Sequence, residues 1–180
     1  MNQSTSLYLS ALREVKWQSV DSFRFPNSLT ERWVLENGSM SHLIKSNCQN
    51  LTVKVLHNKV VKAERLNHQE IQLLDYQQCL LRKVALCGDD VPWVLGRTLI
   101  PESSLDLKGH DFSKQGDTPL GVTIFGSEDV QRDSLQVGVV STETGDVFAR
   151  RSRLWVNQKP MLVAELFLPE CPMYSGETDK

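Results

Sequence analysis

The segment 161–168 constrains the fold most strongly, because it is apolar on both faces of an extended strand. Period-two alternation places Met161, Val163, Glu165 and Phe167 on one face, and only leucine and alanine on the other. A strand that is apolar on both sides is usually covered on both sides. The sequence therefore predicts a sheet with layers packed on each face, and a Glu165 carboxylate that is paired, protonated or facing a polar cavity.

A second charge interrupts an apolar strand at Arg82. The runs 78–87 and 92–101 flank a glycine and two aspartates, a pattern typical of an antiparallel hairpin. Arg82 lies in the first run and shares its strand face with leucine and valine side chains. A cation in this position requires a partner, just as the carboxylate of Glu165 does.

Two interpretations account for this pair of charges. Arg82 and Glu165 could pair with each other, or lie at a sheet margin where water reaches them. Alternatively, they line a closed pocket in which Arg82 binds a ligand carboxylate through two hydrogen bonds and Glu165 accepts or supplies a proton. The strand pattern leaves both interpretations open, and the second predicts a small anionic ligand.

Other arginines are weaker candidates for an anion site. The cluster Arg150-Arg151-Ser152-Arg153 splits between the two faces of a strand, so we expect a solvated face or salt bridges at the rim. Arg97 follows Gly96 in the second run of the hairpin, where it could be a second ligand cation, a cation–π contact or one half of a structural ion pair. The pattern does not choose among these three roles.

The remaining chain predicts helices first and a long antiparallel meander afterwards, which is an α+β fold with one sheet flanked by helices. We expect one domain over residues 1–174 and a polar tail over 175–180. The expected helices cover residues 7–15, 28–35 and 119–125, and the further strands cover 51–56, 60–61, 134–141 and 147–156, with a turn at Asn58-Lys59.

Composition excludes several classes of protein. The 180 residues carry 20 Lys and Arg against 22 Asp and Glu, a net charge of -2 that disfavours a nucleic-acid-binding protein. No apolar run is long enough to span a bilayer, and the first residues lack the features of a signal peptide, so we expect a cytoplasmic protein.

Neither the four cysteines nor the four histidines have metal-ligand spacing, and phosphate loops, dinucleotide fingerprints and a GxSxG elbow are missing from the sequence. We expect no metal and no cofactor.

At these residues the chain resembles the chorismate pyruvate-lyase family of bacterial ubiquinone biosynthesis. The resemblance runs from about residue 29 to 174, fades over 57–76, and is loose over the first 25 residues. No single motif is specific for the family, but the motifs taken together in their order are. They are Gly38-Ser39-Met40, Leu86-Cys87, Pro92-Trp93, Gly96-Arg97-Thr98 with Pro101, Thr118-Pro119-Leu120-Gly121, Arg132-Asp133, Arg150-Arg151-Ser152-Arg153-Leu154, Lys159-Pro160, Glu165-Leu166-Phe167-Leu168-Pro169 and Pro172-Met173-Tyr174.

The resemblance implies a monomer with a buried ligand site under helical flaps and no cofactor. By position, Arg82 matches the arginine that binds the ring carboxylate, and Glu165 matches the acid that meets the ring hydroxyl. Leu120 matches a residue that contacts ligand through its backbone, and Met40 matches a flap residue that covers the pocket. The departures from the family pattern are Lys83, where an acid is common, and the Asp89-Asp90-Val91 turn, which lacks the usual glycine.

The implied reaction is the conversion of chorismate to 4-hydroxybenzoate and pyruvate, with aromatisation of the ring. Two readings without catalysis remain: an aromatic-acid sensor module of the same fold, and a carrier for an aromatic product. The related sensor modules follow an N-terminal helix-turn-helix domain, which the residues before Ser28 are too few to form.

Overall fold

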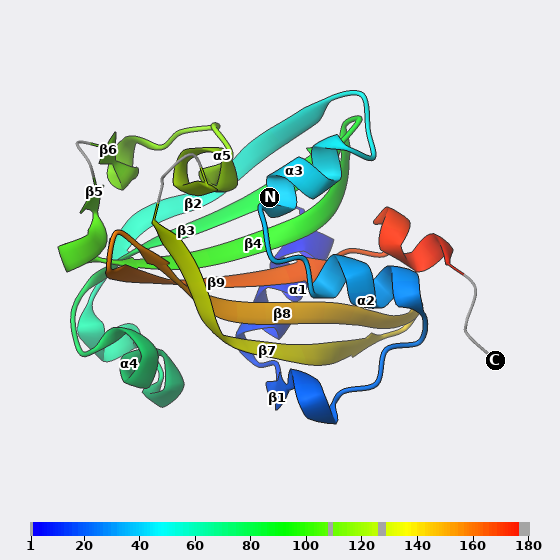
Figure 1. Cartoon of the computed structure of the whole chain (residues 1–180), viewed down its shortest axis with the longest axis horizontal. Coiled ribbons are helices and arrows are strands. Elements are labelled where there is room, and N and C mark those ends of the chain that lie inside the picture. The colour runs from blue at the N-terminus through cyan, green and yellow to red at the C-terminus, as the bar shows by residue number, and fades with distance from the viewer. Residues whose placement is uncertain (1, 108–109, 126–128, 177–180) are drawn as a thin grey trace.

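A computed structural model describes residues 2–107, 110–125 and 129–176 of the chain. Within these residues the centre is a seven-stranded antiparallel sheet with the strand order β1-β7-β8-β9-β4-β3-β2 (Figure 1). Its strands are β1 (Gln18–Ser19), β2 (Leu51–Val61), β3 (Cys79–Gly88), β4 (Val91–Pro101), β7 (Val130–Thr142), β8 (Gly145–Val156) and β9 (Lys159–Phe167). The short strands β5 (Asp106–Leu107) and β6 (His110–Asp111) form a separate pair. The predicted α+β class with one flanked antiparallel sheet is confirmed.

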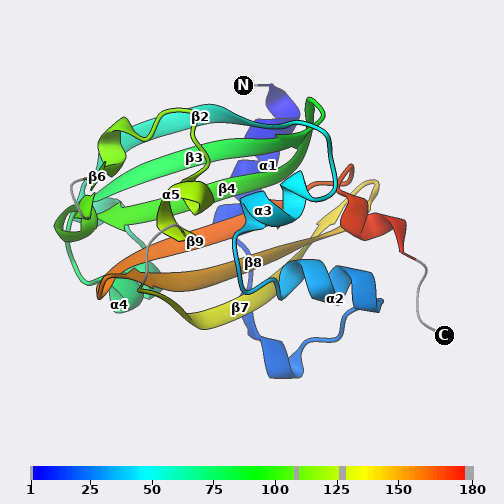
Figure 2. The same ribbon diagram turned by 45° about the horizontal axis from the view of Figure 1, so that its top comes forward.

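Helices cover both faces of the sheet (Figures 1 and 2). On one face, which we call the cavity face, lie α2 (Ser28–Val34), α3 (Met40–Lys45) and α5 (Leu120–Phe125). On the opposite face lie α1 (Gln3–Arg13) and α4 (His68–Leu74). Strand β9 lies between the two layers, which is why both of its faces are apolar.

The core on each face is built from alternate residues of the same strands. Leu12 of α1 packs on Leu95 and Leu166, and all three are at most 1% exposed. On the cavity face, Trp33 of α2 belongs to the same buried cluster as Phe167. Leu166 and Phe167 are neighbours in β9, so the period-two alternation predicted for this strand is confirmed.

Helix starts follow asparagine and serine caps, whose side-chain oxygens accept hydrogen bonds from backbone N–H groups. Asn27 caps α2 by accepting from the N–H of Thr30, and Ser39 caps α3 by accepting from that of His42. The helices α3 and α4 were not expected. Each has at most seven residues, too few for a clear period, and is stable only by packing on the sheet.

A tight turn joins β3 to β4, as predicted, and another joins β8 to β9. The turn residues Asp89 and Asp90 have φ values of 48° and 66°, so aspartate adopts the left-handed conformation here without glycine. The Asp89 carboxylate accepts hydrogen bonds from the backbone N–H groups of Gln49 and Asn50 at 2.9 and 2.8 Å. These hydrogen bonds stabilise the Asp89-Asp90-Val91 turn, in which this sequence departs from the family pattern.

The prediction of a turn at Asn58-Lys59 is wrong. Strand β2 runs without interruption across these residues, and its register against β3 shifts between Val55 and His57. This β-bulge explains why the alternation of apolar and polar residues breaks within a continuous strand. Asn58 pairs in register with Arg82 and donates a hydrogen bond to the carbonyl of Ser113.

The last described element is a short 3₁₀ helix, Pro172–Ser175, so Ser175 belongs to this helix and not to the tail expected over 175–180. The tail residues 177–180 lie outside the described residues. Among the described helices, none has the length and apolar character that a bilayer crossing requires.

Candidate active site

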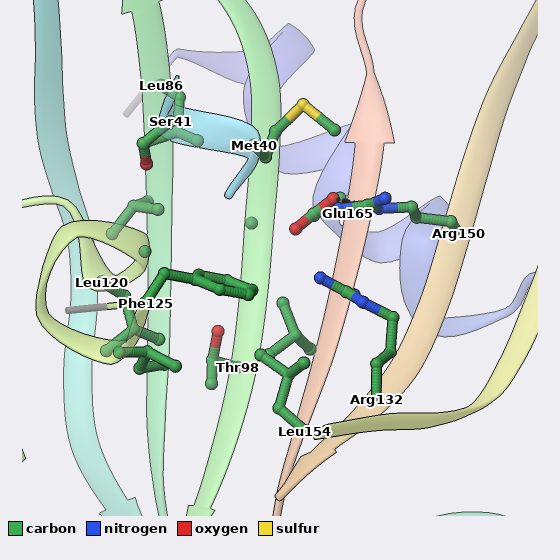
Figure 3. Close-up of a pocket in the computed structure, with 15 residues that line it drawn as sticks. Met40, Ser41, Leu86, Thr98, Leu120, Phe125, Arg132, Arg150, Leu154 and Glu165 are labelled. Atoms are coloured by element: carbon green, nitrogen blue, oxygen red, sulfur yellow. Dashed lines mark hydrogen bonds and ion pairs between the residues drawn. The ribbon is translucent and has the colours of Figure 1, made fainter. Parts of the chain in front are cut away.

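A cavity of about 60 Å³ lies between the cavity face of the sheet and the helices α3 and α5 (Figure 3). Its walls are mainly apolar, as is usual for sites that bind small organic ligands. The lining residues are Met40, Ser41, Val84, Leu86, Gly96, Thr98, Leu120, Gly121, Ile124, Phe125, Arg132, Arg150, Leu154, Val163 and Glu165.

Three of the four predicted site residues line this cavity. Met40 begins α3 and Leu120 begins α5, so both lie in the helical cover. Glu165 reaches the cavity from β9 and is 8% exposed. The structure thus brings together residues that are more than 120 positions apart in the sequence.

Arg82 lies on the same sheet face beside the cavity, but is not one of its lining residues. It is 2% exposed and pairs in register with Thr98, which does line the cavity. Its Nη2 donates to the carbonyls of Gly116 and Thr118 at 2.7 and 3.4 Å, in the segment before α5. Its Nε and Nη1 are buried with no hydrogen-bond partner among the described residues. Burial lowers the pKa of Arg82, an effect that the nearby Asp117 charge opposes.

Glu165 is paired with Arg150 and not with Arg82. The two residues are in register on β9 and β8, and Arg150 Nε donates to Glu165 Oε2 at 2.5 Å. Arg150 Nη1 also donates to the carbonyls of Val34 and Glu36 at the end of α2. The alternative in which Arg82 and Glu165 neutralise each other is therefore wrong.

The expectation of a solvated arginine cluster is also wrong for Arg150, which is 1% exposed. Strand β8 lies between β7 and β9, and α2 covers it on the cavity face. Its neighbour Arg151 is 5% exposed on the opposite face, where it contacts the ring of Trp17 and donates to the side chain of Gln136. Both arginines are internal polar groups with defined partners.

Arg132 is a cavity residue that the strand pattern did not single out. Its Nη1 donates to Ser152 Oγ at 2.5 Å, and its Nη2 donates to the carbonyl of Gly38 at 3.3 Å. Burial and the neighbouring Arg150 charge lower its pKa to about 10, so the guanidinium is charged at neutral pH. Figure 3 shows Arg132 and Arg150 on the same side of the cavity as Glu165, with Leu120 and Phe125 across from them.

Arg97 lies on the opposite sheet face. Its Nη1 is 3.4 Å from Glu70 Oε1 in α4, and both residues are buried. Of the three roles left open by the sequence, the structural ion pair is the one that the geometry supports.

The two helices that cover the cavity touch at Gly121. A β-carbon at this position would lie 2.4 Å from Ser39 Oγ and 3.3 Å from Ser41 Oγ. Glycine therefore permits α5 to pack directly on the start of α3. Within the described ranges, no group of three or more His, Cys, Asp and Glu side chains could hold a metal ion.

Comparison with known proteins extends the resemblance over nearly the whole chain. The sequence profile of the family described as Chorismate lyase matches residues 11–178, which is further toward both ends than the motifs indicated. A relative from Vibrio parahaemolyticus, named probable chorismate pyruvate-lyase, is 55% identical over 177 residues, 98% of this chain and 99% of the relative.

Solved structures share the fold at low sequence identity. PhnF from Mycobacterium smegmatis has a TM-score of 0.55 at 12% identity, covering 76% of this chain and 66% of that protein. The ligand-binding domain of a putative GntR-family transcriptional regulator from Bordetella bronchiseptica has a TM-score of 0.51 at 12% identity, covering 68% of this chain and 86% of that domain.

Proposed function

The chain belongs to the chorismate lyase family, and we propose that it is the lyase that converts chorismate to 4-hydroxybenzoate and pyruvate. The product supplies the ring of ubiquinone. The observation that carries this proposal is the buried Glu165 carboxylate, which faces a largely apolar cavity while Arg82 lies buried on the same sheet face. An aromatic acid with a para hydroxyl group has an anionic end and a hydrogen-bonding end that suit these two side chains.

Each proposed site residue has a distinct role. Arg82 binds the ring carboxylate through its buried guanidinium, in which Nε and Nη1 have no hydrogen-bond partner among the described residues. Glu165, held by Arg150, accepts a hydrogen bond from the ring hydroxyl. The main chain at Leu120 contacts the ligand, and Met40 covers it from α3.

The reaction breaks the ether bond between the ring and the enolpyruvyl group. The ring carbon that carries the hydroxyl loses its hydrogen, the new ring double bond completes the aromatic system, and the enolpyruvyl oxygen becomes the ketone of pyruvate. The methylene carbon of the leaving group gains the hydrogen and becomes a methyl group. Because aromatisation drives the step, the protein mainly has to hold the substrate in a reactive conformation and exclude water.

Glu165 has the geometry of an orienting group. Its Oε2 accepts a hydrogen bond from Arg150 Nε, which fixes the position of the carboxylate. We propose that the hydrogen passes within the substrate, from the ring carbon to the enolpyruvyl methylene. In this mechanism Glu165 fixes the hydroxyl and, through it, the rotation of the ring in the cavity.

A binding protein without catalysis is the second candidate, because the same fold occurs in the ligand-binding domain of a transcriptional regulator. A sensor or carrier would bind aromatic acids and leave chorismate intact. We further propose that the protein works in the cytoplasm, since its four cysteines carry free thiols and a reducing compartment preserves them. We propose that it is a monomer, as the family resemblance implies.

One assay distinguishes the lyase from a sensor or a carrier. Purified protein is incubated with chorismate, 4-hydroxybenzoate is followed by absorbance, and pyruvate is followed with a coupled dehydrogenase. Equimolar products are expected, whereas binding of chorismate without products would leave a sensor or a carrier. Arg82→Ala should chiefly weaken binding of 4-hydroxybenzoate, and an unchanged affinity would refute the anchoring role of Arg82.

A further inference from the structure

The cavity holds more positive charge than its one carboxylate balances. Among the lining residues that the structure describes, the charged side chains are Arg132, Arg150 and Glu165, with Arg82 buried beside them. Arg150 is neutralised by Glu165. Arg82 and Arg132 have no carboxylate oxygen within 4.0 Å among the described residues.

These two cations approach the cavity from opposite sides. Arg82 is on β3 and Arg132 is on β7, which are separated by three strands. At about 4.8 Å per strand, their backbones are roughly 19 Å apart across the sheet. Two arginines this far apart on one sheet face are suited to two anionic groups on one small molecule and not to one carboxylate.

Arg132 retains capacity for a further partner. Its Nη1 and Nη2 each make one contact, to Ser152 Oγ and to the Gly38 carbonyl, and its Nε is buried with no hydrogen-bond partner among the described residues. The guanidinium of Arg150 is more heavily used, since it holds Glu165 and two carbonyls of the α2 end. Nη2 of Arg150 is also buried with no hydrogen-bond partner among the described residues. Arg150 already has a carboxylate partner in Glu165, however, and Arg132 has none among the described residues, so Arg132 is the cavity arginine whose charge a ligand can balance.

The connectivity of chorismate allows its second carboxylate to reach the Arg132 side. The ring hydroxyl lies on the carbon opposite the ring carboxylate, and the enolpyruvyl ether is on the carbon next to that hydroxyl. If Arg82 binds the ring carboxylate and Glu165 meets the hydroxyl, the enolpyruvyl group extends from the ring near Glu165. Figure 3 shows Arg132 on this side of the cavity.

We propose that Arg132 binds the carboxylate of the enolpyruvyl group, so that Arg82 and Arg132 together select a dianion. This inference rests on the proposed lyase function. Arg132 holds the part of the substrate that leaves as pyruvate, and fixes the ether so that its methylene carbon lies over the hydrogen to be transferred. The remaining product carries only the carboxylate bound by Arg82, so it makes no charged contact with Arg132.

The test compares a ligand that has the second carboxylate with one that lacks it. In Arg132→Gln, we expect kcat/KM for chorismate to fall about 10- to 150-fold, the usual cost of a lost charged hydrogen bond. The Kd of 4-hydroxybenzoate, measured by calorimetry, should change less than about threefold, because this ligand has nothing for Arg132 to bind. Arg132→Lys keeps the charge, so kcat/KM should fall less than in Arg132→Gln.

The matched control is Arg153→Gln, which removes an arginine of β8 whose Asp133 partner lies outside the cavity. It should leave both measurements unchanged. An equal loss of chorismate turnover and of 4-hydroxybenzoate affinity in Arg132→Gln would show a structural role and overturn the inference, as would no loss in either. If Arg132→Gln does not fold, Arg132→Lys is judged by the same two measurements. A wild-type protein that forms no products from chorismate would instead refute the proposed function.

Discussion

Arg150 and Glu165 are direct neighbours across β8 and β9, and their side chains form a buried ion pair with Nε and Oε2 2.5 Å apart. Removing one partner leaves the other charge buried alone, which costs about 3–5 kcal/mol. We therefore expect Arg150→Met to lower the free energy of unfolding by about this amount. Adding Glu165→Leu should recover part of the loss, because the stranded carboxylate is gone.

Urea unfolding at neutral pH measures both variants. Arg153→Met is the control, since the Arg153–Asp133 pair is partly exposed and a pair of this kind is worth at most about 1 kcal/mol. A double variant less stable than Arg150→Met would contradict the argument that the unpaired carboxylate causes the loss.

The proposed role of Glu165 predicts where the hydrogen of pyruvate comes from. If it passes within the substrate, the wild-type reaction in D₂O yields pyruvate whose methyl group carries no deuterium. Glu165→Gln keeps an oxygen that accepts the hydroxyl hydrogen bond, so the methyl group should again carry none. Pyruvate is trapped as lactate during the reaction and analysed by mass spectrometry. Deuterium in the wild-type methyl group would contradict transfer within the substrate and would assign the hydrogen to an exchangeable source, a protein group or water.

The contact between α3 and α5 should control how tightly the cavity closes. A β-carbon added by Gly121→Ala would lie 2.4 Å from Ser39 Oγ, the atom that caps α3. Either the Ser39 hydroxyl rotates away and releases the cap of α3, or the helices separate. In both cases the cover of the cavity loosens, so we expect weaker binding of 4-hydroxybenzoate and a faster release rate. Ser39→Gly removes the obstructing hydroxyl, and glycine at a cap costs only a few tenths of a kcal/mol relative to serine.

The double variant Gly121→Ala with Ser39→Gly should therefore bind 4-hydroxybenzoate more tightly than Gly121→Ala alone. Stopped-flow fluorescence gives the release rates. Equal affinities for wild type and Gly121→Ala would show that this contact does not close the cavity.

Local periodicity explains what could be predicted from the sequence. Alternation within residues 161–168 placed Glu165 on the same face as Val163, and both line the cavity. The hairpin around Asp89 and Asp90 is equally local. These features depend on residues adjacent in the chain, and for that reason the pattern predicts them.

The features that were missed depend on contacts between distant segments. Arg150 is buried because α2 covers β8, and no pattern within 145–156 reveals that cover. The strand pattern did not predict the position of Arg132, because the register of β7 against β8 shifts between Asp133 and Gln136. That shift puts Arg132 on the same sheet face as Val137, five positions later, so simple alternation assigns one of them to the wrong face.

The Asp133 carboxylate should make stability depend on pH. Arg153 donates to both of its oxygens at 2.8 Å, and this bonding holds the pKa of Asp133 below its usual value. A lowered folded-state pKa gives stability that is present above the unfolded value of about 3.9 and lost as pH falls through the folded value. The free energy of unfolding should therefore be higher for wild type than for Asp133→Asn at pH 6, and this difference should be smaller at pH 3. Asp146→Asn, at an exposed position, is the control for urea unfolding, and an equal difference at both pH values would remove Asp133 from the acid response.

Tyr174 ties the C-terminal 3₁₀ helix to the sheet through its hydroxyl group. The hydroxyl accepts from the backbone N–H of Phe148 at 2.9 Å and donates to the carbonyl of Phe167 at 2.7 Å. Tyr174→Phe leaves both backbone groups without this partner, so we expect a loss of about 1–3 kcal/mol. For a chain of this size, the Tm should fall roughly 2–4 °C for each kcal/mol. Tyr76→Phe, at a tyrosine that is 61% exposed, should leave the Tm unchanged. Equal Tm values for the two variants in calorimetry would show that water replaces the Tyr174 hydroxyl at no cost.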